Sequence, residues 1–179
     1  MSFEALNNYE SATIHFKDGT NVLGLAKIIQ GDKIKFKVAK DSKADIWTDL
    51  MVQGITFHSK FEDFEYEYIY TKKAYPILAR VLEEDAMTLY AKSDSYWIPM
   101  SFNKGSGFPT APATHKTTIV FFVKRRHETT VTTFGLWFKK RAKAYFKDCI
   151  GVVEKIDSGE FNSYTIPEMV YYYNDFCGK

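Results

Sequence analysis

Four histidines, His15, His58, His115 and His127, are the side chains best suited to bind a metal or to move a proton near neutral pH. They lie far apart in the sequence, with no HxH or HExxH pattern, and the two cysteines form no CxxC pair. Local spacing therefore predicts no metal or cofactor site. The histidines could still converge in space, so a hydrolase with a spatially assembled histidine site remains a weaker alternative.

Nucleophilic catalysis needs an activated serine or cysteine beside a base, and the sequence has no GxSxG motif at a strand-to-helix turn. Gly105-Ser106-Gly107 lies in an expected loop. Adjacent acids at 62–63 and 83–85 are typical of solvated turns, because neighbouring strand residues point to opposite faces. Phosphate-binding glycine patterns are also missing from the sequence. No catalytic residue is predicted.

Basic residues are concentrated in one stretch. Residues 116–147 hold nine bases and one acid, a net of +8, whereas the rest of the chain holds 15 bases and 21 acids. A hairpin tip and the helix after it could gather six of these bases on one side of the fold: Arg125, Arg126, Lys139, Lys140, Arg141 and Lys143.

Such a surface would attract the phosphates of nucleic acid or of anionic lipid. A solvated helix face, whose charge is offset by the acids of the β part, explains the same pattern and is the interpretation we favour. The aromatic residues in this stretch, Trp137, Phe138 and Phe146, are interpreted as core.

The two cysteines, Cys149 and Cys177, lie on the apolar sides of two expected helices. If those helices pack antiparallel, the thiols could form a disulfide that closes a loop of about 28 residues. Two buried free thiols in a reducing cytoplasm are the alternative, and the residues leave both open.

The overall composition indicates a folded protein. The chain has 179 residues, of which 45% are hydrophobic and 26% charged, enough to bury a core in one domain without metals. No apolar run is long enough to span a membrane. The first residues lack the basic start and apolar core of a signal peptide, so we expect a cytoplasmic protein, or a periplasmic or cell-envelope one if a signal peptide has been removed.

Short alternating segments dominate the first 133 residues and predict strands. Gly24 inside one of them suggests a bulge or sharp bend. Residues 75–84 fit a strand or a helix, and residues 103–116, with two glycines and two prolines, predict a long exposed loop. The expected strands cover residues 12–17, 22–29, 33–38, 51–58, 61–70, 86–91, 96–100, 117–123 and 128–133.

The hydrophobic period changes at Phe134. Apolar residues at 134, 138, 142, 145 and 149 predict an amphipathic helix, and a second helix ends at Ser158-Gly159. A third begins at Thr165, which should form a capping box with Glu168. We therefore expect an α+β fold: a small bent barrel or sheet over 12–133, for which an SH3-like form is one option, and a helical segment over 134–177 packed on it.

The helical segment also carries a family resemblance. Tyr145-Phe146-Lys147-Asp148-Cys149, and the later residues from Val170-Tyr171-Tyr172-Tyr173-Asn174 to Cys177, are similar to the C-terminal signature of uncharacterised exported proteins of Bacteroidetes, F-x-D-C … Y-N-x-x-C. The resemblance extends to the β-rich half. It implies export to the periplasm or envelope and an intact cysteine pair, and it brings no activity with it.

These observations favour a non-enzymatic binding or interaction module of the cell envelope, with an unknown protein or peptide as partner. Tyrosines within 61–70 offer the large contact area with a polar tip that suits recognition. A binder of anionic polymer or of a membrane surface through residues 116–147 is the alternative.

Overall fold

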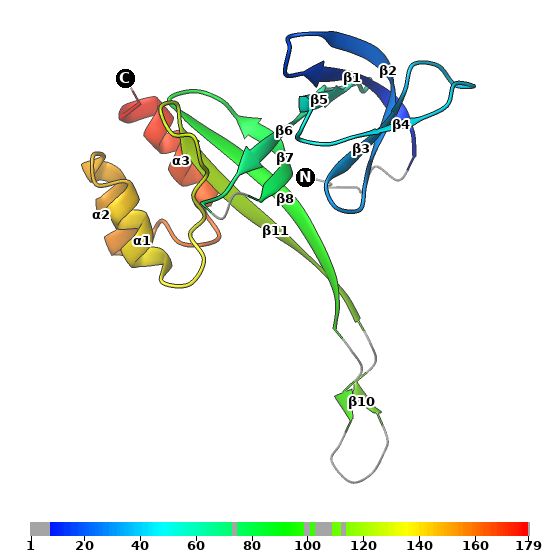
Figure 1. Ribbon diagram of the computed structural model, residues 1–179. Coiled ribbons are helices and arrows are strands. Elements are labelled where there is room, and N and C mark those ends of the chain that lie inside the picture. Colours follow the sequence, from blue (N-terminus) through cyan, green and yellow to red (C-terminus); the bar gives the residue numbers. More distant parts are fainter. Residues whose placement is uncertain (1–7, 73–74, 99–100, 103–108, 112–113, 179) are drawn as a thin grey trace.

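The computed structural model describes residues 8–72, 75–98, 101–102, 109–111 and 114–178. It has the expected α+β architecture, in which an antiparallel sheet is followed by three C-terminal helices (Figure 1). Among the described residues the main sheet has nine strands in the order β11-β8-β7-β6-β5-β1-β2-β3-β4, and it does not close on itself. Of the two options that the sequence left open, the structure therefore has a sheet.

The first five strands form one half of this sheet. They are β1 (Glu10–Phe16), β2 (Asn21–Ile29), β3 (Lys33–Lys37), β4 (Asp45–Trp47) and β5 (Val52–Phe57). Their order within the sheet is β5-β1-β2-β3-β4. The first two hairpin turns lie between the expected strands, at Gly19 and Gly31, which have φ values of 89° and 79° that glycine adopts readily.

The alternating apolar residues of these strands face a common core, as predicted. This first core contains Ala12, Ile14, Ala26, Ile34, Phe36, Val52, Ile55, Phe57, Tyr68 and Leu78. Tyr66 packs against it as well. The predicted recognition surface on residues 61–70 is therefore wrong for Tyr66 and Tyr68, because alternate residues of a strand share the face that Phe57 and its neighbours bury.

Gly24 permits a close approach between β2 and β3. A Cβ at this position would lie 2.4 Å from the carbonyl oxygen of Lys37 and 2.6 Å from the ring of Phe36. The ladder with β1 runs through Gly24 without a register shift, so the bulge that the sequence suggested is not formed there. Gly24 is needed because a side chain has no room at this position, and not because the pairing register changes there.

The second half of the sheet consists of β6 (Phe64–Tyr70), β7 (Pro76–Glu83), β8 (Met87–Ile98) and β11 (Thr114–Arg125). The ambiguous residues 75–84 therefore form a strand. The strands expected at 86–91 and 96–100 form one strand, β8, as far as Ile98, and residues 99–100 lie outside the described residues. The long hairpin of β8 with β11 extends away from the rest of the molecule (Figure 1).

The loop predicted over 103–116 is wrong where the structure describes it. Pro109–Ala111 form β10, which pairs with β9 (Ser101–Phe102), and β11 already begins at Thr114. Strand pairing satisfies the backbone groups of this segment, which outweighs the local turn signals of its glycines and prolines. Residues 103–108 and 112–113 lie outside the described residues.

A second core lies inside the curl of β6, β7, β8 and β11. It contains Ile69, Ala79, Tyr90, Phe122 and Val131. The return strand predicted at 128–133 is reduced to one bridge, in which Thr132 and Val123 exchange hydrogen bonds of 2.9 and 2.8 Å. Next to it the Val131 N–H donates to the Tyr70 carbonyl over 2.9 Å, so this short segment links β11 back to β6 around the core.

Three helices follow, α1 (Phe138–Tyr145), α2 (Ile150–Ser158) and α3 (Ile166–Phe176). The first starts four residues later than predicted, because Trp137 has a left-handed φ of 65°. The predicted capping box at Thr165 is also wrong. Its hydroxyl accepts the Asn162 N–H over 2.9 Å in the preceding turn and caps no helical N–H.

The helices bury their apolar stripes on the face of β8 and β11 that points away from the second core (Figure 1). This third core contains Met87, Leu89, Val123, Phe134, Ala142, Phe146, Cys149, Val152, Ile156, Phe161, Ile166, Met169, Val170 and Tyr173. Asn174 of α3 is buried beside it, where its amide donates to the Met87 carbonyl and accepts the Met87 N–H, both over 2.9 Å. Its side chain thus replaces a strand neighbour at the start of β8.

Candidate functional site

The two cysteines are joined by a disulfide. Cys149 directly precedes α2 and Cys177 directly follows α3, and their Cα atoms lie 5.7 Å apart. The bond lies against the third core, in which Cys149 is buried. Of the two interpretations that the sequence left open, the structure has the bonded pair.

Arg125, the first of the six predicted anion-binding residues, belongs to an internal network. Its guanidinium donates to both carboxylate oxygens of Asp148, over 2.9 and 2.6 Å, and to the Tyr145 carbonyl over 2.7 Å. It also lies over the rings of Tyr145 and Tyr173, 5.0 and 5.2 Å from their centroids. A bidentate, stacked arginine of this kind fixes α1 and α3 to the end of β11 and has little capacity left for an external anion.

Two tyrosine hydroxyls complete this network. Tyr173 donates to Asp148 over 2.8 Å, and Tyr145 donates to Glu128 over 2.5 Å. Burial by itself raises the pKa of Asp148, but the hydrogen bonds from Arg125 and Tyr173 outweigh it and hold that pKa below its ordinary value. Burial and then Glu128 raise the pKa of Tyr145, so its hydroxyl stays a donor.

Three more of the six bases are paired on the surface. Arg126 lies 3.8 Å from Asp85, and Lys139 and Lys143 lie 3.2 and 2.6 Å from Asp157. Hydrogen bonds from Lys143 and Lys139 lower the pKa of Asp157. Exposed ion pairs of this kind contribute little to folding stability, yet they reduce the net positive charge that a partner would meet.

Lys140 and Arg141 differ from the other four, because neither side chain forms an ion pair or a side-chain hydrogen bond with the described residues. They adjoin Leu136 and Trp137, which are 85% and 81% exposed. We call Leu136, Trp137, Lys140 and Arg141 the Trp137 patch. The interpretation of Trp137 as core is therefore wrong: the helix begins only at Phe138, and the left-handed turn before it leaves the indole outside.

Two hollows in the surface are lined by Trp137. One hollow of about 400 Å³ is lined by Trp137, Lys140 and Arg141. Another of about 620 Å³ is lined by Trp137, Phe138, Lys139, Lys140 and Lys143. The patch thus combines exposed apolar surface, two cations that have no ion pair among the described residues, and concave surroundings.

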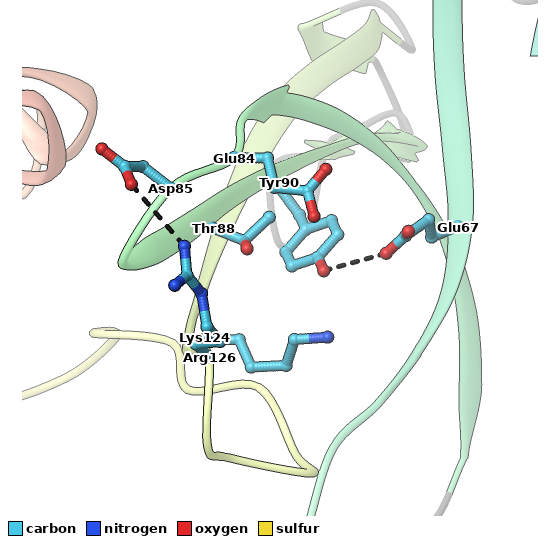
Figure 2. Close-up of a pocket in the computed structure, with 7 residues that line it drawn as sticks. All are labelled: Glu67, Glu84, Asp85, Thr88, Tyr90, Lys124 and Arg126. Carbon is cyan, nitrogen blue, oxygen red and sulfur yellow. Dashed lines mark hydrogen bonds and ion pairs between the residues drawn. The ribbon is translucent and has the colours of Figure 1, made fainter. Parts of the chain in front are cut away.

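A polar pocket opens at the mouth of the curl formed by β6, β7, β8 and β11 (Figure 2). We call it the Tyr90 pocket. It has a volume of about 370 Å³ and is lined by Glu67, Glu84, Asp85, Thr88, Tyr90, Lys124 and Arg126. Tyr90 belongs to the second core, but its hydroxyl reaches this pocket and donates to Glu67 over 2.9 Å.

The Tyr90 pocket is lined by three acids and two bases. Burial raises the pKa of Tyr90, and the charge of Glu67 raises it further. The pKa of Glu65, on the same face of β6, is raised first by burial and then by the charges of Glu67 and Glu84. Glu67 and Glu84 therefore both contribute negative charge near this part of β6.

Two histidines, His15 and His58, lie on the same outer face of the sheet at β1 and β5. The His58 Nε2 lies 2.8 Å from the Thr13 hydroxyl, and its Nδ1 lies 2.8 Å from Asp63. Because the carboxylate only accepts, Nδ1 carries a proton, and in the neutral imidazole Nε2 then accepts the Thr13 hydroxyl. We call Thr13, His58 and Asp63 the His58 relay, since it has the order hydroxyl, imidazole and carboxylate.

A second imidazole on this face has nearly the same neighbours. The His15 Nε2 lies 2.8 Å from the Thr56 hydroxyl, and its Nδ1 lies 2.8 Å from the amide oxygen of Asn21. The difference is the third group, which is a neutral amide instead of a carboxylate. His115 lies on β11 and His127 after it, so the four histidines do not assemble together, and the described residues contain no cluster of three metal-ligating side chains.

The sequence contained a signal for the histidine pairs that sequence reasoning missed. Thr13-Ile14-His15 and Thr56-Phe57-His58 repeat a T-x-H pattern on two strands, and alternate strand residues face the same side. In the structure Thr13 pairs with Thr56, so each histidine lies beside the threonine of the other strand. The Tyr90 pocket had no comparable signal, because its residues come from four separate segments.

The comparisons with known proteins add no assignment: no family model, curated protein or solved structure matches the chain. No helix within the described residues has the length and apolar character needed to cross a membrane.

Proposed function

We propose that this protein is a non-enzymatic binding module that docks an acidic protein segment on the Trp137 patch. The exposed, left-handed Trp137 is the observation that carries the proposal. A left-handed conformation costs a residue with a side chain about 1–2 kcal/mol. The fold retains this conformation although the indole stays largely in water, which is typical of strain kept for a function.

The composition of the patch supports a protein partner. Tryptophan and arginine are the residues most enriched among those that dominate protein interfaces. The two hollows lined by Trp137 can receive side chains of a folded or extended segment. The unpaired Lys140 and Arg141 favour acidic groups at the rim.

The cell envelope is the compartment that we propose. The disulfide between Cys149 and Cys177 supports an oxidising environment, because such bonds are rare where thiols are kept reduced. The resemblance of the C-terminal segment to exported proteins of Bacteroidetes supports the same compartment.

Peptide display tests the proposal. A random peptide library is selected on the immobilised protein after depletion on a triple variant, Trp137→Ser, Lys140→Gln and Arg141→Gln. We expect enriched peptides that combine acidic with large apolar residues and bind the triple variant at least about thirtyfold more weakly. A control variant at another exposed aromatic and lysine, Phe61→Ser with Lys60→Gln, should bind like the wild type.

Two results would contradict this proposal. One is that selected peptides bind the triple variant as well as the wild type, and the other is that they lack acidic residues. Salt-dependent retention on heparin or on phosphatidylserine vesicles, lost in the triple variant and without any peptide binding, would instead favour the anionic polymer or membrane surface as partner.

A hydrolase of small esters is a second candidate, which the His58 relay favours. In this reading the Thr13 hydroxyl attacks the ester carbonyl while His58 accepts its proton and then returns it to the leaving alcohol. Asp63 holds the imidazole in the required tautomer. Water then cleaves the acyl–threonine ester and releases the acid.

The parallel His15 arrangement provides the matched control for this candidate. With p-nitrophenyl acetate, Thr13→Val and His58→Gln should each lower kcat/KM about a hundredfold or more. Thr56→Val and His15→Gln should change it little, because their third group is an amide. Equal effects at both arrangements, or no acyl-enzyme on Thr13 by mass spectrometry, would exclude the candidate.

A further inference from the structure

We infer that the Tyr90 pocket binds a small zwitterion of the α-amino acid class, independently of the Trp137 patch. The pocket has a volume of about 370 Å³, which lies in the range of small-molecule sites. Its floor is the buried Tyr90, whose hydroxyl is held by Glu67 and is therefore fixed in orientation.

The negative side of the pocket suits an ammonium group. Glu84 forms no ion pair or hydrogen bond with the described residues, and Glu67 accepts only the neutral Tyr90 hydroxyl. Burial, and then the charges of Glu67 and Glu84, raise the pKa of Glu65, so both carboxylates act on the same residue of β6. A ligand ammonium that reaches both carboxylates would provide the missing charge.

The positive side suits a carboxylate. The Lys124 ammonium lies 5.4 Å from the centroid of the Tyr90 ring and forms no ion pair with the described residues. Figure 2 shows Glu84 and Lys124 on opposite sides of the Tyr90 ring in that view, with both charged ends turned toward the pocket. Arg126 is less available to a ligand, because its guanidinium already lies 3.8 Å from the carboxylate of Asp85.

The arrangement therefore selects a ligand with both charges. An amine alone would leave the Lys124 ammonium without a partner, and a carboxylate alone would meet the field of two acids. Charge-assisted hydrogen bonds on both sides, each stronger than a neutral one, favour the compact zwitterion over either half.

The test uses the folded, ¹⁵N-labelled full chain in NMR titrations at low salt. The probes are the free L-amino acids, followed by the α-amide and the α-hydroxy acid of the one that binds most tightly. We expect saturable shifts at the amides of residues 84–90 and 124–126, and affinities about tenfold or more weaker for the amide and the hydroxy acid.

Matched variants locate the ligand. Glu84→Gln and Lys124→Met should each weaken binding about tenfold or more. Glu83→Gln, one residue away and outside the pocket, and Lys116→Met, on the same face of β11, should bind like the wild type. Dispersed amide spectra of all four variants verify that they are folded.

Three outcomes would overturn the inference. The first is that no amino acid gives saturable shifts, and the second is that the amide or the hydroxy acid binds as tightly as the zwitterion. The third is that Glu84→Gln and Lys124→Met bind as well as Glu83→Gln and Lys116→Met.

Discussion

At the scale of single residues, the contact between Arg125 and Asp148 shows how a basic stretch can serve the fold. We expect Asp148→Asn to lower the free energy of unfolding at pH 7 by about 1–2 kcal/mol, since the amide cannot replace a bidentate, partly exposed carboxylate. Urea unfolding followed by circular dichroism measures this loss.

The stability difference between the wild type and Asp148→Asn should also depend on pH. The pKa of Asp148 is lower in the folded protein than its ordinary value of about 3.9, so its contribution is complete above that pH and disappears as the pH falls through the folded pKa. The stability difference between wild type and Asp148→Asn should therefore shrink below about pH 4. A difference that stays constant down to pH 2 would contradict the assigned role. Asp157→Asn, at an exposed pair, should have a smaller effect at every pH.

At the scale of elements, the disulfide restrains the two helices that follow Cys149. Replacing both cysteines by serine should lower the free energy of unfolding by about 3 kcal/mol, because the bond closes a loop of 28 residues. Hydrogen exchange should become faster in α2 and α3, while β1 to β3 keep their protection. Protection lost equally throughout the sheet would contradict this local effect. Wild-type protein treated with a reductant should behave like the double variant.

Glycines test how closely the elements approach one another. Gly24→Ala would place a methyl group against the Lys37 carbonyl and the Phe36 ring, so we expect a loss of about 1–3 kcal/mol. Gly135→Ala is the matched control, because a Cβ there meets no atom within 4 Å. Thermal melts of both variants measure the difference, and equal melting temperatures would show that β2 and β3 separate without cost.

At the scale of the whole molecule, shared strands connect the three cores. Within β6, Tyr68 belongs to the first core and Ile69 to the second, and within β8, Leu89 belongs to the third core and Tyr90 to the second. We therefore expect one cooperative unfolding transition with equal calorimetric and van't Hoff enthalpies. Ile14→Ala in the first core and Met169→Ala in the third should lower the same transition. Two separate transitions would show that residues 12–133 and 134–177 fold independently.

Much of this architecture was predictable because it depends on local patterns. The strands with strict alternation, such as β1 and β3, and the apolar stripe of the helices lie close to the expected residues. The capping box at Thr165 was wrong because the preceding turn, through the Asn162 N–H, takes the Thr165 hydroxyl. The loop over 103–116 was wrong where the structure describes it, because its residues pair with β9 and β8.

The candidate sites were less predictable, because they depend on which residues remain without partners. Six bases looked alike in the sequence, yet Arg125 is held by Asp148, whereas Lys140 and Arg141 are free of such contacts among the described residues. Only the fold decides which acid reaches which base. The His58 relay is an intermediate case, because its T-x-H pattern is visible but the strand pairing is not.

The sequence by itself determined the α+β class, most strands and the helical C-terminal segment, since hydrophobic periodicity selects each element locally. Only the tertiary structure decided that the cysteines are bonded, that Trp137 is exposed and that Tyr90 lies beneath a charged pocket. These features depend on contacts between residues far apart in the chain, and a local pattern contains no information about them.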